Sequence, residues 1–219
     1  GLVTICMVDD DFGPATKVLH AVRDFAGQDV EILFCDDDQP YEPDWAQRFL
    51  DQRARHPDAC IVEKGHDIDT RPPGERYRGQ DRPQPRAKAR KKDLAYRLFR
   101  LLTLLTIKPK PYVADGFVDI LEGYRGALIR PDFIPPEAFD IPDILWTVDD
   151  PWLSGHMTRN GVPIWLMTNP PLWGKPYSAH FTESLAALIH ADHGRIDSDS
   201  ACIAYFRDTY GIWPGDGPY

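Results

Sequence analysis

Residues 30–45, VEILFCDDDQPYEPDW, join an apolar run to three consecutive aspartates and a Pro-rich end. The apolar run VEILFC predicts a buried strand, and the Asp- and Pro-rich stretch after it predicts a loop. A helix is expected to begin at Pro43, because proline is favoured at the first position of a helix. Asp36, Asp37 and Asp38 therefore follow the carboxyl end of a strand, where open α/β sheets bind their ligands.

The segments on both sides repeat this alternation of strands and helices. Before the triplet, residues 2–8 predict a buried strand and residues 14–27 predict a helix. After it, residues 43–56 predict a helix and residues 59–63 a third strand. This β-α-β-α-β order predicts a mostly parallel, Rossmann-like sheet flanked by helices.

The remainder of the chain resumes an α/β pattern after a basic segment. Strands are expected at 124–130 and 162–167, and helices at 148–160, 182–193 and 198–210. A length of 219 residues with 42% hydrophobic residues suits one domain with a real core. We therefore expect a single domain over residues 1–219, with a basic insertion at about 64–111.

Adjacent carboxylates repel one another and need a cation, hydrogen-bond donors or water. A nucleotide diphosphate is anionic as well, and a divalent ion between carboxylates and phosphates turns this repulsion into attraction. Mg²⁺ and Mn²⁺ prefer oxygen ligands and bridge carboxylates to phosphates in this way. For a bare Asp-Asp-Asp, a solvated turn that also caps a helix is the more frequent explanation, so the surrounding sequence decides.

Four segments carry a resemblance to a known family. They are DDDQPYEPDW at 36–45, DFGPATK at 11–17, GYRG at 123–126 and DDPWL at 149–153. By their order and spacing along the chain, they resemble GT-A-fold glycosyltransferases, in particular family-2-like bacterial enzymes. The triplet resembles their Asp-x-Asp element, and Asp149-Asp150 is similar to their Glu-Asp-x-x-Leu element, with Asp149 in place of Glu.

The resemblance implies roles for particular residues. Asp150, with Asp149 beside it, is implied as the base that takes a proton from the acceptor hydroxyl in an inverting transfer. The other implied site residues are Asp36 and Asp38 for Mn²⁺ or Mg²⁺, Asp11, Lys17, Asp36 and Asp37 for the donor, and Tyr124 and Arg125 for the acceptor.

Each assignment has a plainer alternative. Asp149 and Asp150 are also suited to capping a helix, and Lys17 to pairing with Asp11 or lying on the surface. Arg125 is also suited to a salt bridge within an acidic body. His156 lies six residues after Asp150 on the same expected helix, so it is expected to face elsewhere, as a packed or surface histidine. The later histidines His180, His190 and His193 are expected to be structural, since no spacing selects one as a ligand.

The implied function is transfer of a sugar from a nucleotide-diphosphate-sugar to a glycan or lipid-linked acceptor in surface polysaccharide assembly. These enzymes carry a further β-α unit before the Asp-Phe-Gly-Pro element, whereas this sequence opens on the strand that leads into it. The alternative is therefore a catalytically weak or inactive binding module for nucleotide-sugars or glycans. A phosphatase with an Asp nucleophile is disfavoured, because Pro40 stands where its motif has Thr or Val.

Charge is distributed unevenly along the chain. Residues 64–111 hold 14 Lys and Arg against 5 Asp and Glu, whereas the rest holds 11 against 29. The run RAKARKK at 86–92 precedes an apolar helix expected at 93–106, which suits an anionic membrane surface contacted through residues 86–107. The alternatives are a lid over the acceptor cleft and a helix packed in the core. A nucleic-acid partner is not expected, because the body is acidic.

The four cysteines, Cys6, Cys35, Cys60 and Cys202, form no C-x-x-C pair. We expect reduced, mostly buried thiols, which fits a cytoplasmic protein, with peripheral contact at the inner face of the membrane. No signal peptide is expected at the start of the sequence, and the nearly apolar stretch 101–107 is too short to span a bilayer.

Overall fold

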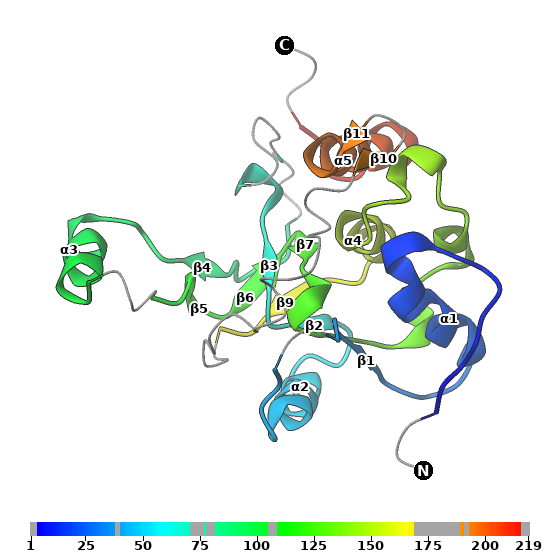
Figure 1. The fold of residues 1–219 in the computed structure, drawn as a ribbon, viewed down its shortest axis with the longest axis horizontal. Coiled ribbons are helices and arrows are strands. Elements are labelled where there is room, and N and C mark those ends of the chain that lie inside the picture. Colours follow the sequence, from blue (N-terminus) through cyan, green and yellow to red (C-terminus); the bar gives the residue numbers. More distant parts are fainter. Residues whose placement is uncertain are drawn as a thin grey trace.

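The computed structural model of this protein describes residues 4–37, 40–70, 77, 82–104, 109–168, 189–190 and 193–215. Its ribbon shows a mixed α/β fold around a central open sheet (Figure 1). The strands of that sheet, in spatial order, are β1 (Ile32–Phe34), β8 (Ala127–Ile129), β2 (Cys60–Val62), β9 (Ile164–Leu166) and β6 (Gly116–Val118).

The central sheet is mostly antiparallel, so the prediction of a mostly parallel sheet is wrong. Only β2 and β9 run parallel, and the other three neighbouring pairs run antiparallel. Two strands reverse direction, β6 at the edge beside β9 and, in the interior of the sheet, β8, which enters between β1 and β2. All three residues of β8 are buried, and a short run that is apolar on both faces carries no information about strand direction.

Residues 2–8 were expected to form a buried strand, and the described part of that segment does not. Residues 4–8 adopt no strand, and Ile5 and Met7 are 84% and 91% exposed. An apolar run becomes a buried strand only where a neighbouring strand satisfies its backbone groups. Within the described residues, β1 pairs only with β8.

The helices lie close to their predicted positions. The described α-helices are α1 (Thr16–Asp24), α2 (Trp45–Arg53), α3 (Leu94–Leu102), α4 (Asp150–Arg159) and α5 (Arg195–Tyr210). The helix expected at 182–193 falls largely outside the described residues, and where it is described the prediction is wrong, because 189–190 and 193–194 form the paired strands β10 (Ile189–His190) and β11 (His193–Gly194). Short 3-10 helices occupy Gly13–Ala15, Ile68–Thr70, Gly123–Arg125, Pro131–Phe133, Pro136–Phe139 and Asp143–Leu145.

Helices cover both faces of the central sheet. Cys60 and Val62 of β2 belong to a core cluster that includes apolar side chains of α1 and α4. Ile61, between them, belongs to a different cluster with Phe49 of α2. Successive strand residues point to opposite faces, so the two clusters mark the two sides of a three-layer α/β/α arrangement (Figure 1).

An arm of the chain leaves this body at the basic segment. Its base is the pair β3 (Gly65–His66) and β7 (Ile120–Leu121), and its outer part is the pair β4 (Lys88–Ala89) and β5 (Tyr112–Ala114). Figure 1 shows α3 at the far end of this arm, away from the layers of the body. No side chain of α3 is buried, which excludes the alternative of a helix packed in the core. No helix among the described residues is long and apolar enough to cross a membrane.

Gly126 joins the loop at 123–126 to β8 and is expected to tolerate no side chain. Its φ is +117°, and an added Cβ would lie 2.6 Å from Trp45 and 2.7 Å from Phe49. We expect Gly126→Ala to lower the free energy of unfolding by about 2–4 kcal/mol, from backbone strain and overpacking combined. Gly27→Ala is the matched control, because Gly27 has φ +74° and nothing within 4 Å of an added Cβ. Urea unfolding measures both, and equal losses would contradict the packing argument.

The α4–α5 contact is an aromatic cluster around a buried histidine. The ring centroid of His156 lies 4.5 Å from that of Trp152 and 5.0 Å from that of Phe206. Neither ring nitrogen of His156 has a hydrogen-bond partner among the described residues. Burial lowers the pKa of His156 to about 4, with Arg159 lowering it further and Glu137 opposing. Of the two environments expected for this histidine, packed or surface, the structure shows the packed one.

His156 should therefore make the fold sensitive to mild acid. The folded-state pKa is below that of an unfolded histidine, so the unfolded chain binds more protons between pH 6.5 and about 4. The free energy of unfolding contains the full contribution of neutral His156 above pH 6.5. This contribution is lost as the pH falls toward 4, by at most about 3 kcal/mol in total. Urea unfolding from pH 7 to 4.5 should show a shallower decline for His156→Leu than for the wild type. Parallel declines would contradict a neutral buried imidazole.

Candidate functional site

Three acidic or basic side chains from distant segments meet at one point of the fold. The Nζ atom of Lys17, in the first turn of α1, lies 2.8 Å from Oδ1 of Asp36, two residues after β1. The same atom lies 2.8 Å from Oδ2 of Asp149, at the start of α4. Lys17 thus pairs with Asp36 and Asp149 rather than with Asp11. These residues come from three of the four segments that carry the glycosyltransferase resemblance.

The two aspartates at the start of α4 have different partners. Asp149 is the N-cap residue of α4, yet its side chain makes no capping hydrogen bond, and it is buried against Lys17. Asp150 is the first residue of the helix, and its Oδ1 accepts a hydrogen bond of 2.9 Å from the backbone N–H of Gly123. Capping therefore does not explain Asp149, and Asp150 connects α4 to the loop at 123–126.

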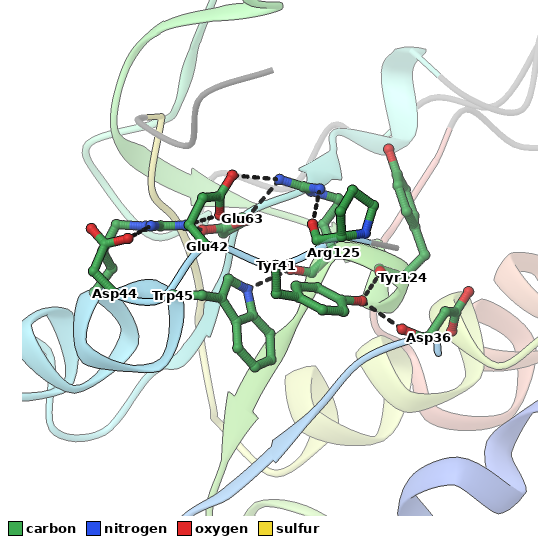
Figure 2. A network of polar contacts seen from close by, with 10 residues as sticks. Asp36, Tyr41, Glu42, Asp44, Trp45, Glu63, Tyr124 and Arg125 are labelled. Atoms are coloured by element: carbon green, nitrogen blue, oxygen red, sulfur yellow. Dashed lines mark hydrogen bonds and ion pairs between the residues drawn. The ribbon is translucent and has the colours of Figure 1, made fainter. Parts of the chain in front are cut away.

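Tyr41 ties the acidic loop to the same 123–126 loop. Figure 2 shows its hydroxyl between two backbone carbonyls, 2.6 Å from that of Asp36 and 3.0 Å from that of Tyr124. Burial is the main cause that raises the pKa of Tyr41, so the hydroxyl keeps its proton and donates it. Sequence reasoning gave Tyr41 no role, although its position five residues after Asp36 was a usable signal. Its contacts fix the backbone of Asp36 at the edge of the site.

Arg125 lies in a buried ion cluster next to the site (Figure 2). Its Nη2 is 3.9 Å from Oε1 of Glu42 and 3.7 Å from Oε2 of Glu63, and Arg48 lies 2.7 Å from Oε1 of Glu63. Burial raises the pKa of Glu63, and the two arginines oppose that shift. The structure thus places Arg125 in the salt bridge of the acidic body that was its alternative. Trp45 adds a hydrogen bond of 3.1 Å to the carbonyl of Arg125.

Of the other predicted site residues, Asp11 and Asp37 lie outside this group of contacts. Asp11 stabilises its own turn, because its Oδ1 accepts from the N–H of Gly13 at 2.8 Å and from the Thr16 hydroxyl at 3.3 Å. Asp37 lies in a turn and is exposed. Asp38, the predicted metal ligand, lies outside the described residues. Tyr124 contributes the backbone carbonyl that Tyr41 contacts.

The site is acidic even with Lys17 in place. Burial disfavours the charged form of Lys17, but the nearby Asp149, Asp150 and Asp36 outweigh it and raise the pKa of the lysine. The three carboxylates of Asp36, Asp149 and Asp150 and the one ammonium give a formal charge of −2. An anionic ligand is repelled by such a site unless a cation accompanies it.

Comparison with known proteins found no match. No protein-family model, no curated protein and no solved structure matches this chain.

The oxygen atoms of the site suit a metal ion shared with a bound phosphate better than an ion enclosed by protein side chains alone. Within the described residues, no three His, Cys, Asp or Glu side chains are grouped so as to enclose an ion. Mg²⁺-like ions, however, are usually held by one or two carboxylates together with substrate phosphates. Asp36, whose side chain is 33% exposed, and the exposed Asp37 can offer oxygen ligands of this kind. The residues present therefore fit an ion that arrives with a diphosphate.

Proposed function

We propose that this protein is a GT-A-like glycosyltransferase that moves a sugar from a nucleotide-diphosphate-sugar to a glycan or lipid-linked acceptor, with inversion. One observation carries the proposal: Lys17 Nζ lies 2.8 Å from both Asp36 and Asp149. Three motifs that resemble glycosyltransferase elements, far apart in sequence, thereby share one site. We further propose that the protein works in the cytoplasm, in the assembly of surface polysaccharide.

Asp36, Asp37 and Asp38 are the proposed binding residues for Mn²⁺ or Mg²⁺ and the donor diphosphate. A divalent ion bound there would neutralise the negative charge that develops on the departing diphosphate. Lys17 neutralises part of the charge of Asp36 and Asp149, which lowers the repulsion that an incoming diphosphate meets. Tyr41 holds the backbone of Asp36 in position through its 2.6 Å contact.

Asp150 is the proposed base. Its place at the N-terminus of α4 favours the ionised carboxylate, which a base requires. Gly123 donates to one oxygen of Asp150, so the carboxylate is oriented by the same loop that contains Tyr124. In the proposed reaction, the acceptor oxygen attacks the anomeric carbon, its proton passes to Asp150, and the bond to the diphosphate breaks. Asp149 is buried beside Lys17 and is better suited to positioning that lysine than to contacting the acceptor.

Binding of nucleoside diphosphates tests this proposal at equilibrium. Calorimetric titration with UDP, GDP, CDP and ADP, with and without Mn²⁺, should show metal-dependent binding of at least one of them. Asp36→Asn should weaken that binding by tenfold or more, a loss of about 1.4 kcal/mol. Asp29→Asn, at an exposed position, is the matched control and should bind as the wild type does. Failure of the folded wild type to bind any of the four would reject the donor site.

A binding module for nucleotide-sugars or glycans is the second candidate. The observation that favours it is again Lys17, which pairs with both Asp36 and Asp149 and offsets part of the charge that a metal ion would otherwise meet. Such a module would bind a nucleoside diphosphate or a sugar but release no product. Measurement of product release therefore separates the two candidates.

A further inference from the structure

The helix at the end of the arm has an exposed apolar face. Leu94, Leu98, Leu101 and Leu102 are spaced so that they share one side of α3. Their exposed fractions are 81%, 57%, 66% and 74%, the opposite of what an apolar helix face in a folded body shows. A cluster of four exposed leucines marks a surface that contacts something apolar.

The polar side of α3 faces the arm and leaves the leucines outward. Tyr96, Arg100 and Thr103, which share the opposite side of the helix, are partly buried. A hollow between α3 and the β4–β5 pair is lined by basic residues such as Lys88 and by apolar ones such as Phe99 and Val113. Asp93 caps the helix by accepting a 2.9 Å hydrogen bond from the N–H of Tyr96, so α3 has a defined start.

Basic residues adjoin this apolar face. Residues 88–104 hold six Lys and Arg against one Asp, a formal charge of +5. Lys91 and Lys92 are exposed immediately before α3 begins. Arg86, by contrast, is engaged with Asp67 and Asp119 at the root of the arm, where it fastens the arm to the body. Lys91 and Lys92 therefore present charge to solvent at the N-terminal end of α3, and Arg97 on the helix is exposed as well.

We propose that α3 and residues 88–92 form a docking surface for an anionic lipid bilayer. Leucines on one face of a helix and basic residues beside it match the acyl chains and the anionic headgroups of such a surface. A second copy of the chain fits less well, because a stable protein interface engages about 20–30 residues a side and α3 has nine. The helix lies in the plane of the interface and does not span the bilayer.

This surface goes beyond the proposed glycosyl transfer and does not depend on it. Figure 1 shows α3 at the opposite side of the molecule from α1, whose Lys17 belongs to the candidate site. Variants of α3 are therefore expected to leave nucleoside diphosphate binding unchanged. Vesicle binding tests this surface and nucleoside diphosphate binding tests the candidate site, so failure of one proposal is distinguishable from failure of the other.

Vesicle co-sedimentation of the full chain tests the surface. Wild-type protein should sediment with phosphatidylglycerol–phosphatidylcholine vesicles and not with phosphatidylcholine alone. Raising NaCl from about 0.05 to about 0.5 M should weaken binding by tenfold or more, because salt screens the basic residues. Replacing Lys91 and Lys92 with Ser should weaken binding about fivefold per residue.

The apolar face is tested separately. Leu98→Glu combined with Leu102→Glu should lower the partition coefficient by tenfold or more, because both leucines leave the acyl region. Met7→Glu is the matched control, since Met7 is 91% exposed and lies outside the arm. The proposal is overturned if wild type fails to sediment with anionic vesicles at low salt, or if the Leu98/Leu102 variant binds as the wild type does. A third outcome would also overturn it: the wild type self-associates without binding vesicles, and the leucine variant abolishes that self-association. The apolar face of α3 would then contact a second copy of the chain.

Discussion

Replacing Asp150 with asparagine is expected to lower kcat for glycosyl transfer by about 10²- to 10⁴-fold, the usual contribution of a general base. The amide oxygen of asparagine can still accept the hydrogen bond from Gly123 N–H, whereas the amide cannot take up a proton at neutral pH. The change thus removes the proposed chemistry and leaves the contact that orients α4. Initial-rate measurements with saturating donor and acceptor give kcat, and thermal unfolding reports the fold.

Asp143→Asn is the matched control for this prediction. Asp143 is an exposed carboxylate at the start of a short helix and lies outside the group of contacts around Lys17. It should leave kcat unchanged. If Asp150→Asn retained wild-type kcat in a folded protein, Asp150 would not be the base.

Replacing Lys17 with methionine is expected to affect stability and donor binding together. Breaking an exposed ion pair costs at most about 1 kcal/mol, whereas breaking a buried one costs about 3–5 kcal/mol. Lys17 is 24% exposed and Asp149 only 4%, so we expect a loss of about 2 kcal/mol in the free energy of unfolding. Affinity for a nucleoside diphosphate should fall by tenfold or more, because the site becomes more negative by one charge.

A double-mutant cycle isolates the pair. If Lys17 acts through Asp149, then Lys17→Met should lower the free energy of unfolding by less in an Asp149→Asn background than in the wild type. The expected interaction energy is about 1–2 kcal/mol. Arg55→Met, at an exposed position, controls for loss of a surface charge. Full additivity of Lys17→Met and Asp149→Asn would contradict a functional pairing of these side chains.

The local elements of the fold were predictable because local signals specify them. Proline at position 14 and glycine at position 27 bracket the segment that contains α1, and Asp93 precedes α3 as a cap. The short apolar runs at β1, β2, β8 and β9 were identified as strands for the same reason.

Strand direction and pairing were not predictable from those signals. An apolar run such as Ala127–Ile129 is equally suited to a parallel and an antiparallel neighbour, so the antiparallel entry of β8 left no trace in its sequence. Residues 4–8 show the converse, since their apolar character does not bring them into the sheet. Both outcomes depend on contacts between distant segments.

The candidate site was predictable only where a motif supplied the residue. The resemblance selected Lys17, Asp36 and Asp149, which the structure brings into contact. It assigned Arg125 to the acceptor, whereas the cluster of Arg125 with Glu42 and Glu63 joins three segments that no local pattern connects. Buried carboxylates such as Glu63 require cationic partners, and which cation reaches them is settled by the fold.

The decisive experiment measures release of nucleoside diphosphate from a panel of nucleotide-sugars, with and without Mn²⁺. The wild type is expected to hydrolyse at least one nucleotide-sugar in the presence of Mn²⁺, and a chelator should stop the reaction. Asp36→Asn should slow it by tenfold or more while the far-UV circular dichroism spectrum stays unchanged. Absence of metal-dependent release from every nucleotide-sugar in the panel, by a wild-type protein that remains folded, would contradict the assignment of this site to glycosyl transfer.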